Sequence, residues 1–543
     1  MVNVLTGSNS ECPGRIEWRK PAQDSPSWAF GGKEAAGMKT EMSCSQERKR
    51  VTMSNPCQFF RQTAAVLLAF GLVASVLPGF AAEPAGPEWS WGLPIYQIAT
   101  RYYNETGGFK EIEKDIPRLK SLHVGIIYLM PVHPCSDDMS RDAQMRGNNY
   151  QTADFQGVNP AMGSLQDYKD LVRALHANGM YVIQDFVPRH MHPGNNMLKL
   201  HPDWAKGQSW GLPAWNYDNP EAKQYMLESL KYWIREVDID GYRIDVAGMD
   251  PLPKVFKEFI PELKKVKPDI FMLAEADGPQ FHPHYDMTYD WHNLKTLIVE
   301  IVQQGGSASR IDENIRMELA KYPDGALRMR HLDNHDLNVG MAPFGKIPGN
   351  MDERFKGGQK AFAVLAATLP GKWMYFMGNE INNPRRIPHA WGKDYDWIRW
   401  EENPEFTKLY STLGAVHRYN PAVWGGSYRY LNTTRNDHLF VMERKKGDNV
   451  VVVVLNLSAS QTVGTISDAL PEGNFTEAFT NGTGPLSRDV DLPGWGYRVY
   501  VKDTPPLGPA AKSSMTSSIA RNDHATLLSY LFATTDLQPG VPL

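Results

Sequence analysis

The sequence predicts an α/β protein in which a parallel (β/α)8 barrel is followed by a small antiparallel β-sandwich. Two observations support this fold class. Strand-like and helix-like segments alternate through the middle of the chain, and after about Ala422 short β-rich runs separated by turns replace them. Repeated strand–helix units favour a closed barrel over an open parallel sheet. The predicted barrel spans residues 88–420 and the predicted sandwich spans residues 421–503.

Each predicted strand follows a helix that carries an apolar stripe. In the clearest unit, Ser164 and Asp167 make a capping box at the start of a helix, and Gly179 ends that helix before a strand over Tyr181 to Val187. Pro117 is expected to kink or restart the helix that precedes the second strand. Further strands are predicted over Val124–Met130, Ile270–Ala274, Ala326–Leu332 and Trp373–Met377.

The segment Gly241 to Met249 is predicted to be a buried strand although it contains two charged residues. Arg243 and Asp245 are two positions apart, and side chains at i and i+2 of a strand point to the same face. An arginine and an aspartate would therefore share one face of an otherwise apolar strand. Burying two charged side chains on one strand is unfavourable, so this pair indicates a functional role for Arg243 and Asp245.

Acidic residues follow four of the strand-like runs, and His190 and His335 lie near two of them. In a parallel barrel the carboxyl ends of the strands meet at one rim, where catalytic residues lie. A single acid is more simply explained as the cap of the next helix, but four such acids are not. Neighbouring carboxyl groups raise each other's pKa, so one can donate a proton while another attacks, as retaining glycoside hydrolysis requires. The four acids are Asp185, Asp245, Glu275 and Asp336.

The motifs around these acids resemble the α-amylase superfamily, glycoside hydrolase family 13. The resemblance begins at PIYQI (Pro94 to Ile98) and continues in the family's order and spacing through IIYLMPV, NNYQTADF, DFVPRH, LPAWN, GYRIDV, LAEAD, DNHD and LPGKWMYFMGNE. It implies a TIM barrel with a short inserted segment, residues 190–218, after the third strand. It also implies a retaining α-glycoside hydrolase that acts on α-glucans or malto-oligosaccharides through a covalent glycosyl-enzyme intermediate.

The resemblance further implies roles for individual residues. Asp245 matches the nucleophile, Glu275 the general acid/base, and Asp336 the carboxylate that stabilises the transition state. Arg243 matches the arginine that keeps the nucleophile ionised and oriented. The sugar bound at the cleavage point would contact three more residues by stacking or hydrogen bonds, namely Tyr150, His190 and His335.

Two departures from the family concern calcium. Arg189 stands where relatives usually carry an asparagine that binds calcium, and a guanidinium group cannot ligate a cation. The segment RYYNETGGF after the first strand also lacks the family's calcium loop, which is rich in Asp and Asn. We therefore expect no cofactor and no calcium at the usual family sites. Arg189 is expected to pair instead with acidic or carbonyl groups, such as Asp218 or the backbone near His192 to Asn196.

A third departure concerns the substrate, and two other functions stay open. Residues Val246 to Met249 replace the Lys-His pair of endo-acting amylases, which argues against cleavage inside long starch. An α-glucanotransferase or glucoside isomerase would use the same glycosyl-enzyme intermediate. A non-catalytic sugar-binding relative would typically have lost catalytic carboxylates, and all three are present here. The sequence predicts neither linkage specificity nor oligomeric state.

The N-terminal part of the chain predicts export. Arg61, an apolar run from Ala64 to Leu77 and the small residues that follow have the order of a secretory signal peptide, predicted over residues 53–82. The run is shorter than the ~18 apolar residues of a membrane span, so we expect a secreted or periplasmic protein with no span after cleavage. Residues 1–52 are predicted to be a mis-assigned start or a disordered extension, and residues 504–543 a disordered tail.

Composition excludes two classes of partner. The formal net charge of −4 gives no field that would attract nucleic acid or an anionic membrane. Cys135 is the one cysteine that follows the predicted cleavage site, so the exported chain could form no internal disulfide. The resemblance to the α-amylase superfamily implies that the partner is an oligo- or polysaccharide α-glucan.

Overall fold

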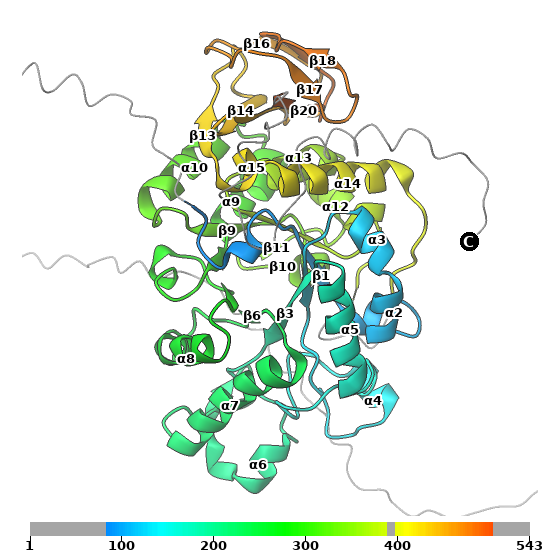
Figure 1. Ribbon diagram of the computed structural model, residues 1–543, viewed down its shortest axis with the longest axis vertical. Coiled ribbons are helices and arrows are strands. Elements are labelled where there is room, and N and C mark those ends of the chain that lie inside the picture. Colours follow the sequence, from blue (N-terminus) through cyan, green and yellow to red (C-terminus); the bar gives the residue numbers. More distant parts are fainter. Residues whose placement is uncertain (1–82, 388–396, 503–543) are drawn as a thin grey trace, which may run out of the picture. The chain divides into compact units, whose positions relative to one another are not determined.

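The computed structural model describes residues 83–387 and 397–502, which form a barrel followed by an antiparallel β region (Figure 1). The predicted signal peptide, the extension before it and the predicted tail lie outside the described residues. Within the described ranges, no helix combines the length and the apolar character needed to cross a membrane.

Eight parallel strands close into the barrel in the order β1-β12-β9-β8-β7-β6-β3-β2. The predicted fold class is thereby confirmed. The strands are β1 (Ile95–Ile98), β2 (Ile126–Leu129), β3 (Tyr181–Phe186), β6 (Gly241–Ile244), β7 (Phe271–Ala274), β8 (Met287–Tyr289), β9 (Leu327–Arg330) and β12 (Lys372–Phe376).

Two features of these strands differ from the sequence prediction. Strand β8 was missed, because its three residues are too few to show the alternation that marks a strand. Strand β6 was predicted to continue to Met249 but ends at Ile244. Val246 has a φ of +45°, which no strand residue adopts, and this turn places Asp245 just beyond the strand.

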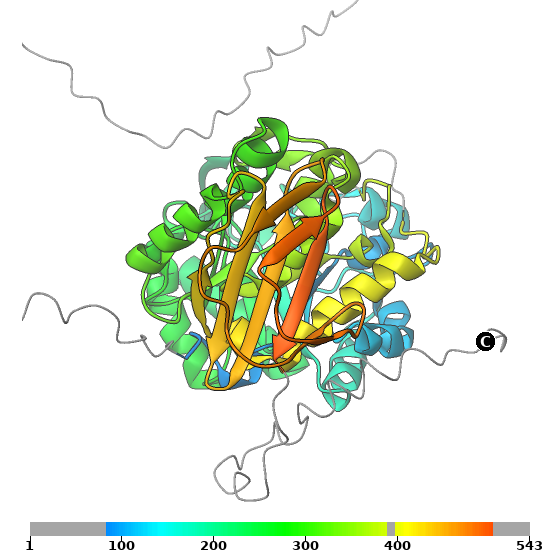
Figure 2. The ribbon, with the colours of Figure 1, turned by 90° about the horizontal axis from the view of Figure 1, so that it is seen from above.

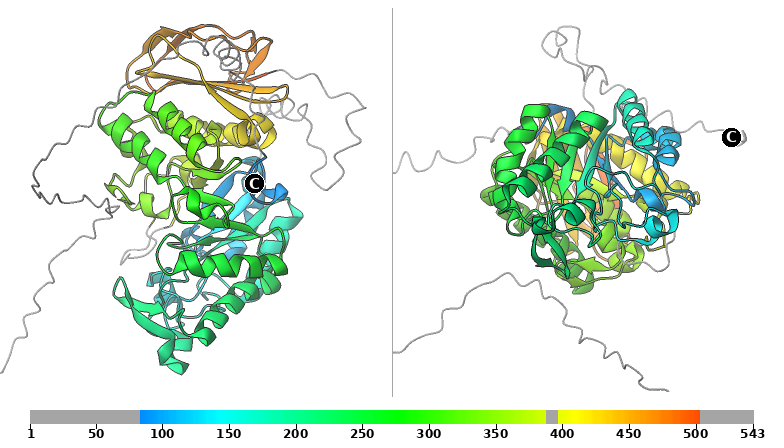
Figure 3. Two further views of the ribbon diagram at one scale, coloured as in Figure 1. Left: turned by 90° about the vertical axis from the view of Figure 1, so that its left-hand side faces the viewer. Right: turned by 90° about the horizontal axis from the view of Figure 1, so that it is seen from below.

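Helices surround the strands (Figures 1 and 3). Among the helices of the first half of the sequence, α7 packs against both α5 and α8. The capping box of Ser164 and Asp167 is present at the start of α5, and Pro117 lies in the first turn of α3. The main helices are α2 (Phe109–Lys114), α3 (Ile116–Ser121), α4 (Arg141–Arg146), α5 (Leu165–Ala177), α7 (Pro220–Val237), α8 (Leu252–Val266), α9 (Trp291–Lys295), α10 (Arg310–Lys321), α11 (His335–Asn338), α12 (Met351–Phe355), α13 (Gln359–Thr368), α14 (Pro404–Tyr419) and α15 (Pro421–Gly425).

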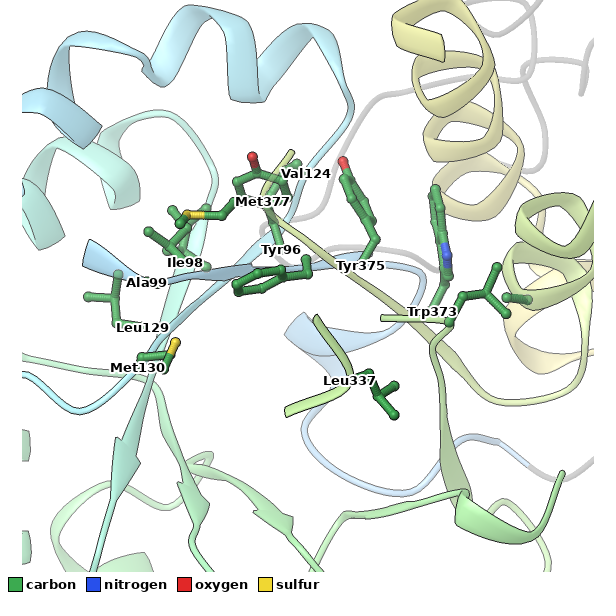
Figure 4. Packing of buried hydrophobic residues seen from close by; sticks show 14 of the residues in the cluster. Tyr96, Ile98, Ala99, Val124, Leu129, Met130, Leu337, Trp373, Tyr375 and Met377 are labelled. Carbon is green, nitrogen blue, oxygen red and sulfur yellow. The ribbon is translucent and has the colours of Figure 1, made fainter. Parts of the chain in front are cut away.

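The core has two layers because alternate strand residues point inward and outward. Inside the barrel, side chains such as Ile95 and Met374 fill one cluster. Outward-pointing residues, such as Trp373 and Tyr375 of β12 (Figure 4), form a larger cluster with the helices. The ring centroids of Trp373 and Tyr375 lie 5.7 and 5.0 Å from the ring centroid of Tyr410 in α14. Position in the alternation therefore decides whether a side chain reaches the barrel interior.

The connection from β3 to β6 contains the short inserted segment. It is made of α6 (Asn196–Leu200), a 3-10 turn and an antiparallel hairpin of β4 (Ala205–Ser209) and β5 (Leu212–Trp215). The indole N–H of Trp215 donates to the carbonyl of Ala222 at 3.1 Å, which ties the hairpin to α7. A second small hairpin, β10 (Met341–Ala342) and β11 (Gly345–Lys346), follows α11.

The C-terminal β region contains a six-stranded antiparallel sheet, whose strands lie side by side in Figure 2, and a two-stranded pair, β16 with β19. Arg444 joins this region to the barrel helices, because its guanidinium donates to the carbonyls of Thr368 at 2.9 Å and Gly426 at 3.0 Å. The strands are β13 (Ser427–Tyr430), β14 (Leu439–Lys446), β15 (Asn449–Asn456), β16 (Thr462–Thr465), β17 (Phe475–Glu477), β18 (Thr483–Gly484), β19 (Asp489–Leu492) and β20 (Tyr497–Lys502).

Lys372, at the start of β12, is a buried cation that the fold holds with carbonyl oxygens. Its Nζ donates to the carbonyls of Ser90 and Leu93, and the residue is 2% exposed. Burial lowers the pKa of Lys372 from 10.5 to about 7. Between these two pH values the unfolded chain binds a proton that the folded chain does not, so this group makes the free energy of unfolding rise with pH.

We expect Lys372→Met to raise the melting temperature at pH 7 and below, where the wild type must bury a charged amine. The gain should shrink as the pH rises toward 10, because the lysine then becomes neutral in both states. Calorimetric melting of both proteins between pH 6 and pH 9.5 measures the difference. A loss of equal size at every pH would contradict the prediction.

Candidate active site

The register of the barrel strands brings the predicted catalytic residues to one rim. Strands β3 and β6 pair with Asp185 beside Arg243, and strands β6 and β7 pair with Ile244 beside Ala274. Asp245 and Glu275 are the next residues of β6 and β7, so they lie next to each other at the carboxyl ends of the strands. Asp336 lies in α11, which follows β9 at the same rim.

Arg243 is the centre of this arrangement. Its Nη1 lies 2.8 Å from Oδ1 of Asp185 and 2.7 Å from Oδ1 of Asp245, and its Nη2 lies 2.8 Å from Oε1 of Glu275. The arginine side chain has no exposed surface. One buried cation therefore contacts three carboxyl groups, one of which belongs to Asp245, just beyond the end of β6.

The third predicted carboxylate faces the same group of charges. Asp336 raises the pKa of both Asp245 and Glu275, so its charge reaches both carboxyl groups. Its Oδ2 lies 3.5 Å from Nε2 of His335, and its side chain is 24% exposed. Asp336 is thus the most accessible of the three, on the open side of the cluster.

Burial dominates the acidity of the two carboxyl groups that share the guanidinium. It raises the pKa of Glu275 to about 8, and the nearby charges of Asp245 and Asp336 add to the increase that Arg243 opposes. It raises the pKa of Asp245 to about 7 against the pull of Arg243 in the other direction. Glu275 has the higher pKa of the two groups, which makes it the better proton donor near neutral pH.

A strained backbone holds Glu275 in place. The backbone N–H of Val246 donates to Oε2 of Glu275 at 2.7 Å. Val246 has a φ of +45°, and a β-branched side chain rarely adopts this left-handed conformation. Such strain costs of order 1–3 kcal/mol and persists where the surroundings fix it. Here it directs one N–H from the residue after Asp245 toward the neighbouring carboxyl group.

A chain of hydrogen bonds leads from β1 to the buried Asp185. The backbone N–H of His335 donates to Oε1 of Gln97 at 3.3 Å, which directs the amide nitrogen of Gln97 toward Nδ1 of His335, 2.8 Å away. Nδ1 therefore accepts, and Nε2 carries the proton and donates to the hydroxyl of Tyr150 at 2.7 Å. The Tyr150 hydroxyl donates in turn to Oδ2 of Asp185 at 2.8 Å. This chain assigns the tautomer of His335.

His190 lies beside this chain at the start of the inserted segment. It is 5% exposed, and burial lowers its pKa to about 4, so the imidazole is neutral. Its ring hydrogen-bonds the backbone of Tyr150, while Nδ1 has no hydrogen-bond partner among the described residues. The ring of Trp210, from the tip of the β4–β5 hairpin, packs against it at a centroid distance of 5.3 Å.

Comparison with known proteins identifies the family. The α-amylase catalytic domain matches residues 97–206 and 204–451, which is more than half of the chain. The chain belongs to the α-amylase family. The predictions of this family, of the barrel and of a retaining α-glycoside hydrolase are therefore confirmed.

Two curated enzymes and one solved structure illustrate the relationship. A cyclomaltodextrinase from Thermoanaerobacter pseudethanolicus is 25% identical over 442 residues, covering 69% of this chain and 72% of that enzyme. A maltogenic α-amylase from Bacillus acidopullulyticus is 25% identical over 393 residues, covering 65% of this chain and 63% of that enzyme. The crystal structure of a maltogenic α-amylase from Thermotoga neapolitana has the same fold, with a TM-score of 0.66 at 22% identity over 76% of this chain and 99% of that structure.

The structure brings all seven sequence-predicted residues of this family member together and adds others. Asp185 had been noted as one of four acids but given no role, and it proves to be the most completely enclosed partner of Arg243. Tyr128 donates to the same carboxylate at 2.9 Å, and Tyr289 lies 3.4 Å from Nε of Arg243. Tyr128 and Gln97 follow the alternation of short strands, which is the one signal in the sequence that they point inward. Tyr289 lies on β8, which is too short to give that signal.

Arg189 pairs with a carbonyl group as expected, but the particular partners predicted for it, Asp218 and the backbone near His192 to Asn196, were wrong. Its Nε donates to the hydroxyl of Ser209 at 3.0 Å, its Nη1 donates to the carbonyl of Asp250, and its guanidinium lies over the ring of Trp210. Asp218 pairs with Lys206 at 2.6 Å instead. The reason is geometric, since the hairpin folds back across the segment and places Ser209 closer. Because the guanidinium of Arg189 has hydrogen-bond donors and no acceptor, it cannot be a ligand of a cation at this position. The expected absence of calcium here stays a prediction.

Arg243→Met should destabilise the protein strongly, because it leaves three buried carboxylates without their cation. We expect a loss of about 3–5 kcal/mol in the free energy of unfolding at pH 8. The loss should be smaller at pH 5, since carboxyl groups of raised pKa are then protonated and need no counter-charge. Urea unfolding at the two pH values measures both effects.

The Arg243→Lys variant is the control, since it keeps the charge but cannot make the forked contacts. A methionine variant as stable as the wild type at pH 8 would show that the cluster does not depend on the cation.

Proposed function

We propose that this α-amylase family member hydrolyses short α-glucans with retention of configuration, through a glycosyl-enzyme intermediate on Asp245. One observation carries the proposal: Asp245 and Glu275 contact two different nitrogens of the same guanidinium group. Their carboxyl groups are thereby held on neighbouring sides of one planar cation. Retaining enzymes need this closeness, with a separation of about 5–5.5 Å, because no water has to fit between nucleophile and sugar.

Glu275 acts first as the acid in this mechanism. Its raised pKa keeps it protonated near neutral pH, so it gives its proton to the glycosidic oxygen as the bond to the leaving sugar breaks. The backbone N–H of Val246 donates to Oε2 and Nη2 of Arg243 lies 2.8 Å from Oε1, so both oxygens of the Glu275 carboxyl group are held in position. Asp245 attacks the anomeric carbon at the same time and forms the covalent ester.

Water completes the reaction from the position that the leaving sugar vacates. Glu275, now a carboxylate, takes a proton from this water, and the resulting hydroxide equivalent displaces Asp245 from the anomeric carbon. Asp336 faces the same point and stabilises positive charge on the ring in both transition states. Neutral His190 and the His335–Tyr150 pair offer hydrogen bonds and a ring face to the sugar.

Short substrates are the better match to this chain. The Val246–Met249 segment carries no basic side chain that would hold a long leaving group. The named relatives are a cyclomaltodextrinase and a maltogenic α-amylase, and both names describe action on maltose-based saccharides. We also propose that the protein is exported, on the strength of the apolar run from Ala64 to Leu77.

Product analysis tests the proposed function. The wild type, incubated with maltohexaose, a cyclomaltodextrin and soluble starch, should release products whose new reducing ends first appear as the α-anomer in proton NMR spectra. Asp245→Asn keeps the shape of the side chain and should lower turnover by about a thousandfold or more. Initial β-anomers, or a variant within tenfold of the wild type, would refute the nucleophile. Longer products formed with added maltose would assign the reaction to a glucanotransferase instead.

Glu275→Gln should affect substrates according to their leaving groups. The loss in kcat/KM should be large for maltohexaose and smaller for aryl α-glucosides, whose leaving groups need little protonation. In the wild type, kcat/KM should fall as the pH rises through about 8, because Glu275 then loses the proton it must donate. This alkaline fall should be missing in the variant. Equal losses on both substrates, or an unchanged alkaline fall, would remove Glu275 from the acid role.

A further inference from the structure

Arg354, in the short helix α12, is a buried arginine that the proposed mechanism does not use. Its side chain has no exposed surface, and a guanidinium group carries five N–H donors. All five donors of Arg354 have an acceptor. Nε donates to the carbonyl of Pro348 at 2.9 Å, Nη1 to the carbonyl of Leu332 at 2.6 Å and to Oδ1 of Asp333 at 2.9 Å, and Nη2 to the carbonyls of Leu337 at 2.6 Å and Gly349 at 2.8 Å.

These acceptors lie on both sides of the carboxylate that stabilises the transition state. Two of them precede Asp336 in the sequence, and Leu337 follows it. We call residues 332–338 the Asp336 loop. The helix within this loop, α11, has four residues, which are too few to be stable without tertiary contacts. The position of Asp336 therefore depends on contacts from outside the loop, and Arg354 supplies three of them.

Asp333 balances the charge of Arg354 and makes a second connection to the loop. Its side chain also has no exposed surface. Its Oδ2 accepts hydrogen bonds from Nδ2 of Asn338 and from Nδ2 of Asn379, each at 3.2 Å. A buried ion pair adds little net stability over apolar packing of similar volume, whereas the forked guanidinium fixes its acceptors in one geometry. The pair is therefore better explained by the geometry of the loop than by stability alone.

Helix α12 gives the guanidinium a fixed base. The side chain of Asn350 caps the helix by accepting from the backbone N–H groups of Asp352 at 2.8 Å and Glu353 at 3.2 Å. Phe355 is buried, and its ring centroid lies 4.9 Å from that of Phe362 in α13. The backbone of Arg354 is thus anchored on an outer helix of the barrel while its guanidinium contacts the rim.

We propose that Arg354 is a positioning residue for the hydrolysis, which holds the Asp336 loop so that the Asp336 carboxylate faces the reacting sugar. This inference rests on the proposed function, since it concerns the carboxylate that stabilises charge in that reaction. Arg354 has no exposed surface, so it acts through Asp336. Charge interactions weaken with distance, and a misplacement of about 1 Å in an active site can lower the rate about a hundredfold.

Arg354→Lys separates this role from a purely structural one. Lysine keeps the charge, but its ammonium has three donors and no fork, so the loop should move. We expect kcat for maltohexaose to fall about tenfold to a hundredfold with KM within about threefold, because Asp336 acts on charge that develops in the transition state. The alkaline fall of kcat/KM should move to lower pH, since Asp336 raises the pKa of Glu275. Steady-state kinetics between about pH 5 and pH 10 measure both effects.

A double-mutant cycle shows whether Arg354 acts through Asp336. With an activated aryl α-glucoside as substrate, Arg354→Lys should lower kcat strongly in the wild type but by less than about threefold in Asp336→Asn, whose carboxylate is already lost. A loss by the same factor in both backgrounds would assign Arg354 to the fold as a whole and overturn the inference.

Arg444 provides a matched control. Like Arg354 it is 1% exposed and donates to carbonyl groups, those of Ser427, Thr368 and Gly426, but it lies where the C-terminal β region meets the barrel helices. Arg444→Lys should lower the melting temperature about as much as Arg354→Lys and leave kcat and KM as in the wild type. An equal fall in kcat would show that the loss of any buried arginine lowers turnover, which would overturn the inference.

Asp333→Asn serves the same test if Arg354→Lys does not fold. An amide cannot accept from Arg354 with one atom and from two further amides with the other, so the loop should again move and kcat should fall selectively. A value of kcat equal to that of the wild type would contradict the proposal.

Crystal structures keep the test independent of turnover. The Asp336 carboxylate of Arg354→Lys should be displaced by about 1 Å relative to Asp245 and Glu275, whereas Arg444→Lys should leave it in place. If the wild type proves inactive on α-glucans, the proposed function fails, while the displacement still reports on the role of Arg354. An undisplaced carboxylate, or a displaced one with unchanged kcat, would overturn the inference.

Discussion

The rim of this barrel depends on the enclosure of one guanidinium by three carboxylates. Arg243 has no exposed surface, and its charge is balanced within the protein by Asp185, Asp245 and Glu275. Buried ions are expensive unless their partners satisfy them, and breaking such a group leaves uncompensated charge in a low dielectric. The surrounding strands must therefore hold their register closely. Asp185 and Arg243 are paired neighbours in β3 and β6, so the sheet itself sets the distance between the two charges.

The balance of the cluster also creates its chemistry. A single cation cannot fully offset three nearby carboxylates that burial already disfavours, and so the pKa values of Asp245 and Glu275 rise. Asp185 has two tyrosine hydroxyls in addition to the arginine, and these additional donors stabilise its charge. Burial and the charges of Asp245 and Asp336 give Glu275 a higher pKa than Asp245, although the backbone N–H of Val246 also donates to Glu275. Unequal electrostatics within one ion cluster thus separate an acid from a nucleophile.

The sequence predicts the catalytic residues of this site better than the residues that hold them in position. Asp245, Glu275 and Asp336 follow recognisable strand-like runs, and the motifs around them are specific. Gln97 and Val246 lie within two of these motifs, but no pattern predicts their contacts, because a hydrogen bond across the barrel and a left-handed backbone depend on tertiary structure. Strand β8 was missed for its brevity, and the partners of Arg189 were wrong because they depend on how the hairpin folds back. Local pattern specifies the elements, whereas contacts distant in sequence specify the side-chain partners.

The two ends of the barrel handle buried charge in different ways. At the carboxyl ends of the strands, a buried cation meets carboxylates, and the resulting shifts in pKa fall in the range where protons are exchanged near neutral pH. At the opposite end, Lys372 meets only carbonyl oxygens among its described hydrogen-bond acceptors, and burial lowers its pKa with no opposing charge. Carbonyl dipoles can orient an amine but cannot neutralise it, so this charge contributes to structure at a net cost. Groups at both ends therefore titrate near neutral pH, and strand register places acids around the cation at the rim where β3, β6 and β7 end.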